Sequence, residues 1–247
     1  MWNSFALAVQ ALTRLPAQPG LTTTRAQARQ AVFLFPIVGA LVGILLAAVW
    51  AASSRLWSGQ PLVAAALTLT AGLVITGGRG LGGVARAADG IAGRGAGGDR
   101  ARAFAIMRDP RRGTAGLIAG GACLALRLAF LSALVPTIAW PALIVAGAVG
   151  GWATAFSISA FPVARTGGDE PGLAEAGPTE FLVASGVAIV CAAVLPTRGL
   201  LALLAAAIVA APSAAGTNRL LGGLNPPLCA ALGEIAEITA LACLSLR

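Results

Sequence analysis

One polar stretch, TGGRGLGGVARAADGIAG at residues 76–93, holds glycines, arginines and a single carboxylate that could do chemistry in this largely apolar chain. Backbone N–H groups in a glycine-rich turn can surround an anion, and guanidinium groups bind phosphate oxygens through paired hydrogen bonds. The stretch therefore suggests a site for an anionic ligand such as a diphosphate. The alternative is a flexible basic loop that only sets the orientation of a membrane protein.

Within this stretch, Gly78, Gly80 and Gly83 match the pattern G-x-G-x-x-G, which in dinucleotide-binding proteins joins a strand to a helix. Here the preceding residues, PLVAAALTLTAGLVI, form an apolar run that predicts a membrane helix and not a strand. We therefore reject a dinucleotide-binding fold and interpret the glycines as part of a turn.

A second group of charges lies inside apolar segments. Glu234 and Glu237 are three positions apart in CAALGEIAEITALACL, so both lie on one face of a helix. Counted from Leu228, they lie about 9 to 14 Å along that helix, where a carboxylate is costly unless it faces the bundle interior or a cation. Arg127, in the middle of another apolar segment, is the expected counter-charge. Alternatively, the acids are solvated at the membrane interface and Arg127 extends toward a surface.

The elements that must position these groups are membrane helices. Hydrophobic residues make up 57% of the 247-residue chain and charged residues only 11%, whereas a soluble domain carries about 25% charged residues. The sequence predicts an all-α, polytopic membrane helix bundle of about seven transmembrane helices. The predicted spans are Phe33 to Ala52, Pro61 to Ile75, Gly116 to Val135, Pro141 to Phe161, Phe181 to Leu195, Leu200 to Ala215 and Leu228 to Leu246.

The arginines predict the orientation of the bundle, because positive charge accumulates in short cytoplasmic loops. With the N-terminus in the cytoplasm, thirteen arginines fall in cytoplasmic segments and three outside. This places residues 76–113, the main polar loop, in the cytoplasm. Membrane orientation also accounts for the net charge of +8, so we expect no nucleic-acid partner.

The loop at residues 76–113 is predicted to contain a short helix at the membrane surface. Asp99 is a suitable N-cap, Ala103, Phe104 and Met107 fall on roughly one helical face, and Pro110 would end the helix. The N-terminal residues are likewise expected to form a helix on the membrane surface.

The remaining features indicate one integral membrane domain, residues 1–247. The four cysteines lie in apolar spans without metal-type spacing and are expected to be packing residues. Three glycine pairs, Gly39 with Gly43, Gly116 with Gly120 and Gly147 with Gly151, have the four-residue spacing that lets membrane helices approach closely.

The combined order and spacing of several short motifs resembles the cobalamin synthase family over nearly the whole chain. The motifs are LTRLP at 12–16, FPIVGALVG at 35–43, TGG at 76–78, ADG at 88–90, AIMRDPRRGTAG at 105–116, and GGL followed by LGEIAE within 222–237.

This resemblance implies an adenosylcobinamide-GDP ribazoletransferase, a multi-pass enzyme of the bacterial inner membrane. Such enzymes use Mg²⁺ to join adenosylcobinamide-GDP to α-ribazole or its phosphate and release GMP. The implied partners are these two substrates and the lipid bilayer, while association with other pathway enzymes or with itself stays open.

The resemblance also assigns roles to residues. Asp89 and Asp109 become magnesium ligands, and they form the catalytic set together with Glu234 and Glu237. Mg²⁺ is a hard ion that prefers oxygen ligands, and phosphoryl transfer depends on neutralising oxygen charge. The residues assigned to substrate binding are Gly77, Gly78, Arg86, Gly90, Arg108, Arg111 and Arg112.

The chain departs from the family in the acidic run T-G-G-L-H-x-D-G-L-A-D-x-A-D-G. Gly80 stands where the family has histidine, Gly82 and Arg86 stand where it has the first two aspartates, and Asp89 keeps the third. A second hypothesis is therefore a catalytically impaired homologue that acts as a corrinoid-binding, phosphate-binding or scaffolding membrane protein.

Overall fold

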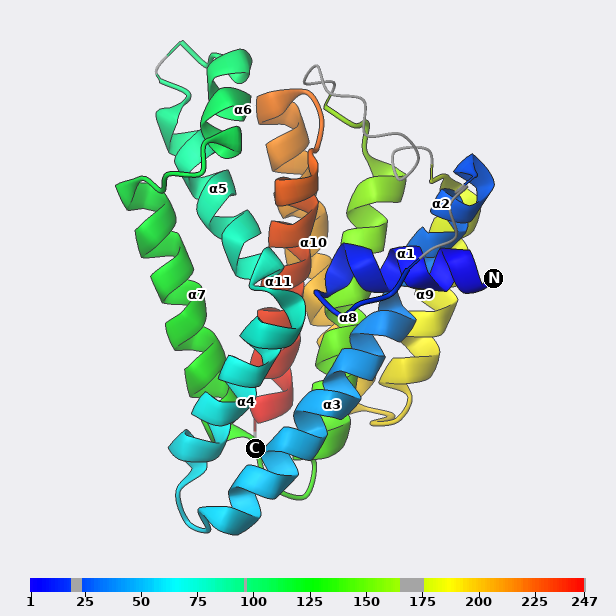
Figure 1. The fold of residues 1–247 in the computed structure, drawn as a ribbon, viewed down its shortest axis with the longest axis vertical. Coiled ribbons are helices and arrows are strands. Elements are labelled where there is room, and N and C mark those ends of the chain that lie inside the picture. The colour runs from blue at the N-terminus through cyan, green and yellow to red at the C-terminus, as the bar shows by residue number, and fades with distance from the viewer. Residues whose placement is uncertain (19–23, 96, 165–175, 247) are drawn as a thin grey trace.

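The protein is a bundle of α-helices (Figure 1). The computed structural model describes residues 1–18, 24–95, 97–164 and 176–246, so Arg165, Arg247 and most of the predicted polar loop at 163–180 lie outside the described residues. Within these ranges the one sheet-like contact is an isolated bridge between Val163 and Leu224. The all-α prediction is confirmed. The helices are α1 (Trp2–Leu12), α2 (Arg25–Phe33), α3 (Phe35–Leu56), α4 (Pro61–Thr76), α5 (Arg79–Gly93), α6 (Arg100–Arg108), α7 (Thr114–Ala133), α8 (Ala139–Ala160), α9 (Pro178–Ala192), α10 (Arg198–Leu221) and α11 (Pro226–Ser245).

Among the described residues, five helices are long and apolar enough to cross a membrane: α3, α7, α8, α10 and α11. The pair α4 and α5 makes a sixth if the two are taken as one span, broken by a bend of 80°. The apolar helix α9 is shorter, with 15 residues. In the most apolar 18 residues of α8, 78% are buried inside the protein, whereas in the corresponding segment of α7 only 17% are buried. Because α7 is apolar but mostly uncovered, its outer face is suited to lipid.

The centre of the bundle is the contact between α3 and α8, where glycines let the two backbones meet. A Cβ atom at Gly43 would lie 2.7 Å from the Ile144 Cα, and a Cβ atom at Gly39 would overlap the Gly147 carbonyl oxygen. A Cβ atom at Gly151 would lie 2.6 Å from the Phe35 carbonyl carbon. The close approach predicted from the four-residue spacing is confirmed for Gly39 with Gly43 and for Gly147 with Gly151. It is not found at Gly120, where a Cβ atom would meet only side-chain atoms at 3.9 Å.

Residues 79–93 correct the sequence interpretation, because they form helix α5 and not a glycine-rich turn. The turn is confined to Gly77 and Gly78, whose φ angles of 64° and 63° lie in the left-handed region that glycine adopts most easily. Glycine normally weakens a helix, but here it allows close packing. A Cβ atom at Gly83 would lie 2.6 Å from the Pro227 carbonyl oxygen of α11.

Helix α6 confirms the predicted short helix inside the 76–113 segment. The Asp99 side chain accepts a hydrogen bond from the Arg102 backbone N–H, and the helix ends at Arg108, two residues before Pro110. Ala103, Phe104 and Met107, which were predicted to share one face of this helix, are buried inside the protein. This buried face packs against α5, which holds α6 beside that helix.

The N-terminal helix α1 lies across the direction of the long helices, on the side of the bundle where α2 begins (Figure 1). The Arg14 backbone N–H donates to the Ile75 carbonyl at 2.8 Å, which joins the chain after α1 to the end of α4. All four cysteines are free thiols, in agreement with the expected packing role.

Candidate functional site

Helix α5 is the element that carries most of the candidate site. Arg79, Gly82, Arg86 and Asp89 follow one another at spacings of three, four and three residues, which places them along one side of the helix. A Cβ atom at Gly82 would meet nothing within 4 Å, and Arg86 is exposed. The two positions where the resemblance leads us to expect aspartates, Gly82 and Arg86, are thus accessible, and the second carries arginine in this chain.

Asp89, at the far end of this side, is buried and bonded to the start of α7. Its Oδ2 accepts a hydrogen bond from the Gly113 backbone N–H at 2.8 Å, and its Oδ1 accepts one from Gly116 at 2.7 Å. The first amides of a helix have no partner within the helix, and a carboxylate there also matches the positive end of the helix dipole. Asp89 therefore caps α7 from another helix and holds α5 next to the loop at residues 109–113.

That loop contains the second predicted magnesium ligand, Asp109. Its Oδ1 accepts a hydrogen bond from the Arg111 backbone N–H at 2.7 Å, and its carbonyl accepts one from Arg112 Nη1 at 2.7 Å. No described residue bonds to Asp109 Oδ2, and the side chain is exposed. The loop therefore presents one available carboxylate oxygen beside Arg108, Arg111 and Arg112.

Glu234 and Glu237 both form ion pairs with Arg127 of α7, so the predicted counter-charge is confirmed. Arg127 Nη1 lies 2.7 Å from Glu234 Oε1, and Arg127 Nη2 donates to Glu237 Oε1. The three side chains are largely buried between α7 and α11. Both carboxylates are therefore paired with one guanidinium inside the bundle and are not solvated at the membrane interface.

The acids fall into two groups that the fold keeps apart. The Glu234 side chain lies against Gly80, near the start of α5, where a Cβ atom would lie 3.0 Å from the Glu234 Cβ. Asp89 is nine residues further along α5, which is about 14 Å along the helix axis. The structure thus brings Asp89 to the Asp109 loop, but it does not bring Glu234 or Glu237 to either aspartate.

The donor set limits how Mg²⁺ could bind. In the ranges that the structure describes, no group of three or more His, Cys, Asp or Glu side chains could hold a metal ion. Asp109 offers one available oxygen among arginines, whereas Mg²⁺ is commonly held by one or two carboxylates together with substrate phosphates and water. The described residues could therefore bind Mg²⁺ only if a bound anionic substrate supplied further oxygen ligands.

The three glycines predicted to bind substrate have different positions. Gly77 and Gly78 form the turn between α4 and α5, and the Arg14 side chain lies over Gly77. Gly90 instead packs against α6, because a Cβ atom there would lie 2.9 Å from the Ala103 carbonyl oxygen. The turn is therefore covered by Arg14 at Gly77, whereas Gly90 lies in the contact between α5 and α6.

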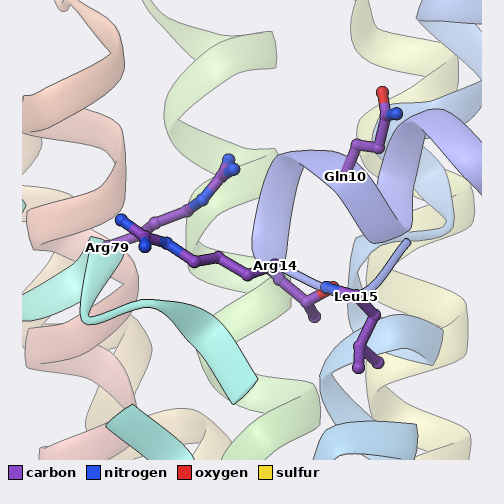
Figure 2. Close-up of a pocket in the computed structure, with 5 residues that line it drawn as sticks. Gln10, Arg14, Leu15 and Arg79 are labelled. Carbon is purple, nitrogen blue, oxygen red and sulfur yellow. The ribbon is translucent and has the colours of Figure 1, made fainter. Parts of the chain in front are cut away.

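A pocket at this turn contains two arginines that the sequence interpretation did not assign to the site (Figure 2). Its volume is about 450 Å³ and its lining residues are Gln10, Thr13, Arg14, Leu15 and Arg79. Arg14 belongs to the motif LTRLP and Arg79 follows TGG directly, so both could have been singled out as arginines inside the recognised motifs.

A second pocket of about 450 Å³ lies between α6 and the end of α10. Arg100 and Arg108 line it together with Phe104 and Leu221, which gives it both cationic and apolar walls. Of the predicted phosphate-binding arginines, Arg108 therefore faces this pocket.

Comparisons with known proteins agree with the motifs. The family model described as cobalamin-5-phosphate synthase matches residues 4–245. An adenosylcobinamide-GDP ribazoletransferase of Pseudomonas fluorescens (strain SBW25) is 34% identical over 98% of this chain and 99% of its own length. Proteins of the same name from Roseiflexus sp. (strain RS-1) and Pseudomonas aeruginosa (strain PAO1) are 36% and 34% identical, each over 99% of this chain and over 91% and 98% of their own lengths. No solved structure matches the chain.

Proposed function

We propose that this chain, which belongs to the cobalamin-5-phosphate synthase family, joins adenosylcobinamide-GDP to α-ribazole or its phosphate late in cobalamin biosynthesis. The products would be adenosylcobalamin, or its phosphate, and GMP. The observation that carries the proposal is the extent of the match, since the family model spans residues 4–245 and the relatives align over nearly their full lengths. No observation favours the alternative of a non-catalytic binding or scaffolding protein.

The reaction transfers a phosphoryl group. A hydroxyl oxygen of α-ribazole attacks the phosphorus atom that carries the cobinamide, the bond from this phosphorus to the oxygen shared with GMP breaks, and GMP leaves. The hydroxyl proton is released, so atoms and charge balance. Catalysis of this kind depends on positioning and on neutralising charge on the phosphate oxygens. Arg111 and Arg112, beside Asp109, are the side chains that we assign to these oxygens, with Arg86 on the adjoining side of α5.

Magnesium would complete the site by neutralising the diphosphate and stabilising the leaving GMP. We propose that Asp109 would hold the ion through Oδ2, together with oxygens of the bound substrate. Asp89 contributes by a different route, because its bonds to Gly113 and Gly116 hold the Asp109 loop beside α5. In this proposal Glu234 and Glu237 hold α11 to α7 through Arg127 and do not touch the reacting atoms.

The proposed setting is the bacterial inner membrane, with α9 as a seventh span and the N-terminus in the cytoplasm. This orientation puts the turn at Gly77, the Asp109 loop and α6 on the cytoplasmic side, which the phosphorylated substrates can reach. Reporter fusions after Arg55 and after Arg112 test it, because the first should report the external side and the second the cytoplasm.

The activity is tested by incubating the purified protein with adenosylcobinamide-GDP and α-ribazole, with and without Mg²⁺. We expect GMP and a cobalamin to form in equal amounts and only with the metal. Arg111→Gln and Arg112→Gln should lower turnover, whereas Arg102→Gln on the exposed side of α6 is the matched control and should not. If both substrates bind and no GMP forms, the non-catalytic alternative replaces this proposal.

A further inference from the structure

We propose that the pocket between Arg14 and Arg79 binds the phosphate of phosphorylated α-ribazole, the acceptor in the reaction. This inference rests on the proposed function and adds to it a second anion-binding site, separate from the Asp109 loop. The consequence is a preference for the phosphorylated acceptor over free α-ribazole.

Two arginines from segments far apart in the sequence converge on this pocket. Figure 2 shows their side chains passing each other: Arg14 extends toward the start of α5, and Arg79 extends back toward the end of α1. Arg79 Nη1 donates to the Ala11 carbonyl at 2.9 Å, which leaves other guanidinium N–H groups available. Both residues are exposed, so a ligand can reach them from solvent.

The pocket walls are fixed before any ligand binds. The Arg14 backbone N–H is bonded to Ile75, and Thr13 Oγ1 both donates to the Val9 carbonyl at 2.8 Å and accepts from the Leu15 N–H at 3.1 Å. The chain on either side of Arg14 is therefore tied to α1 and to the end of α4. Because this backbone is already fixed, less conformational entropy is lost when a ligand orders the arginine side chains.

The charge around the pocket suits a phosphate monoester. Its lining contains no acid, and neither arginine forms an ion pair with a described carboxylate. A phosphate monoester carries about −1.5 to −2 charge at pH 7, which two guanidinium groups can neutralise. The start of α5 adds to this field, because its N-cap residue Gly78 has no capping side chain and the helix dipole is positive at this end.

The same features favour the acceptor phosphate over the diphosphate of the donor. When Mg²⁺ assists the reaction of a diphosphate, the ion is usually held by a nearby carboxylate oxygen. The Asp109 loop offers such an oxygen and this pocket does not. Glu234 lies across Gly80, but it is already bonded to Arg127. The volume of about 450 Å³ exceeds the needs of phosphate alone and leaves room for part of a nucleoside.

The kinetic test compares the two acceptors in wild type and in Arg14→Gln and Arg79→Gln. Losing one charge-assisted hydrogen bond should raise the KM for α-ribazole phosphate roughly tenfold, while the KM for free α-ribazole and kcat with that acceptor stay near wild type. Arg14→Lys and Arg79→Lys, which keep the charge, should recover part of the loss. Arg55→Gln at the far end of α3 is the control. Equal changes for both acceptors would overturn the assignment.

A binding test separates this inference from the proposed function. The melting temperature of detergent-solubilised protein is measured with α-ribazole phosphate, α-ribazole or inorganic phosphate, and the shift should require the phosphate and both arginines. If the shift depends on the phosphate and both arginines but wild type shows no turnover, the pocket assignment is supported and the proposed transferase function is wrong. If turnover occurs but the shift survives both substitutions, the pocket assignment fails. Competition by phosphatidic acid vesicles, with no effect of α-ribazole phosphate, would assign the pocket to lipid and overturn the proposal.

Discussion

Asp89 lies beneath the first turn of α7, with its Oδ1 2.7 Å from the backbone nitrogen of Gly116, 27 residues further along the chain. The N-cap residue of α7, Gly113, has no side chain with which to cap the helix. The cap therefore comes from α5, and one carboxylate couples two helices to the loop that carries Asp109. In this fold the retained aspartate of the family motif positions the site.

The first prediction concerns this cap. Asp89→Ala leaves the buried backbone N–H of Gly116 and the partly buried N–H of Gly113 without partners, which should lower the free energy of unfolding by about 1–3 kcal/mol. Thermal unfolding in detergent measures the loss. Asp99→Ala, which removes the exposed cap of the short helix α6, should have a smaller effect. Asp89→Asn keeps only one acceptor oxygen, and wild-type stability together with undiminished turnover in this variant would contradict both the cap and the placement of the site.

The second prediction concerns the ion pairs inside the bundle. Arg127→Met leaves Glu234 and Glu237 buried and unpaired, at a cost of about 3–5 kcal/mol. The triple variant with Glu234→Gln and Glu237→Gln removes the charges as well and should recover most of the stability. Detergent unfolding curves of the two variants provide the comparison. An Arg127→Met protein as stable as wild type would show that the pairs do not hold α7 to α11.

The third prediction uses neighbouring glycines on α5. Gly83→Ala places a Cβ atom 2.6 Å from the Pro227 carbonyl oxygen, and overpacking of this kind should cost about 1–3 kcal/mol. Gly82→Ala meets nothing within 4 Å and should be neutral or stabilising by up to about 1 kcal/mol, because alanine favours the helix. Equal melting temperatures for the two variants would contradict the packing of α5 on α11.

The same open space makes Gly82→Asp a direct test of the family motif. This substitution restores one aspartate of the acidic run without a steric obstacle, so the protein should fold as wild type does. We expect wild-type protein to turn over without it and Gly82→Asp to reduce the Mg²⁺ concentration needed for half-maximal rate. A wild type that is inactive until aspartate is restored at position 82 would instead support the impaired homologue.

The last prediction concerns pH. Burial alone would raise the pKa of Glu180, but the hydrogen bond from the Gly177 N–H and the ion pair with Arg29 outweigh it and lower the pKa below its usual range. A lowered pKa stabilises the fold above the unfolded value of about 4.3 and loses that contribution as pH falls through the folded value. The start of α9 should therefore loosen in acid, as amide exchange near Gly177 would report. Glu180→Gln should show little of this acid dependence.

The sequence by itself determined the class of protein and most of its helices. Apolar length is a local property, so each of the seven predicted spans falls largely within a helix of the structure. Caps such as Asp99 and the glycine spacing of α3 and α8 are also local, and they were predicted correctly. The pairing of Arg127 with Glu234 could be anticipated because charges are so scarce among the apolar segments.

Only the tertiary structure decided what the site residues do. Residues 79–93 read as a turn because glycine is a poor helix former, yet packing against α11 makes them a helix. The cap made by Asp89 and the pocket of Arg14 and Arg79 depend on contacts between residues far apart in sequence, such as Arg79 and Ala11, separated by 68 positions. Such contacts follow from how helices pack, which no local pattern of residues specifies.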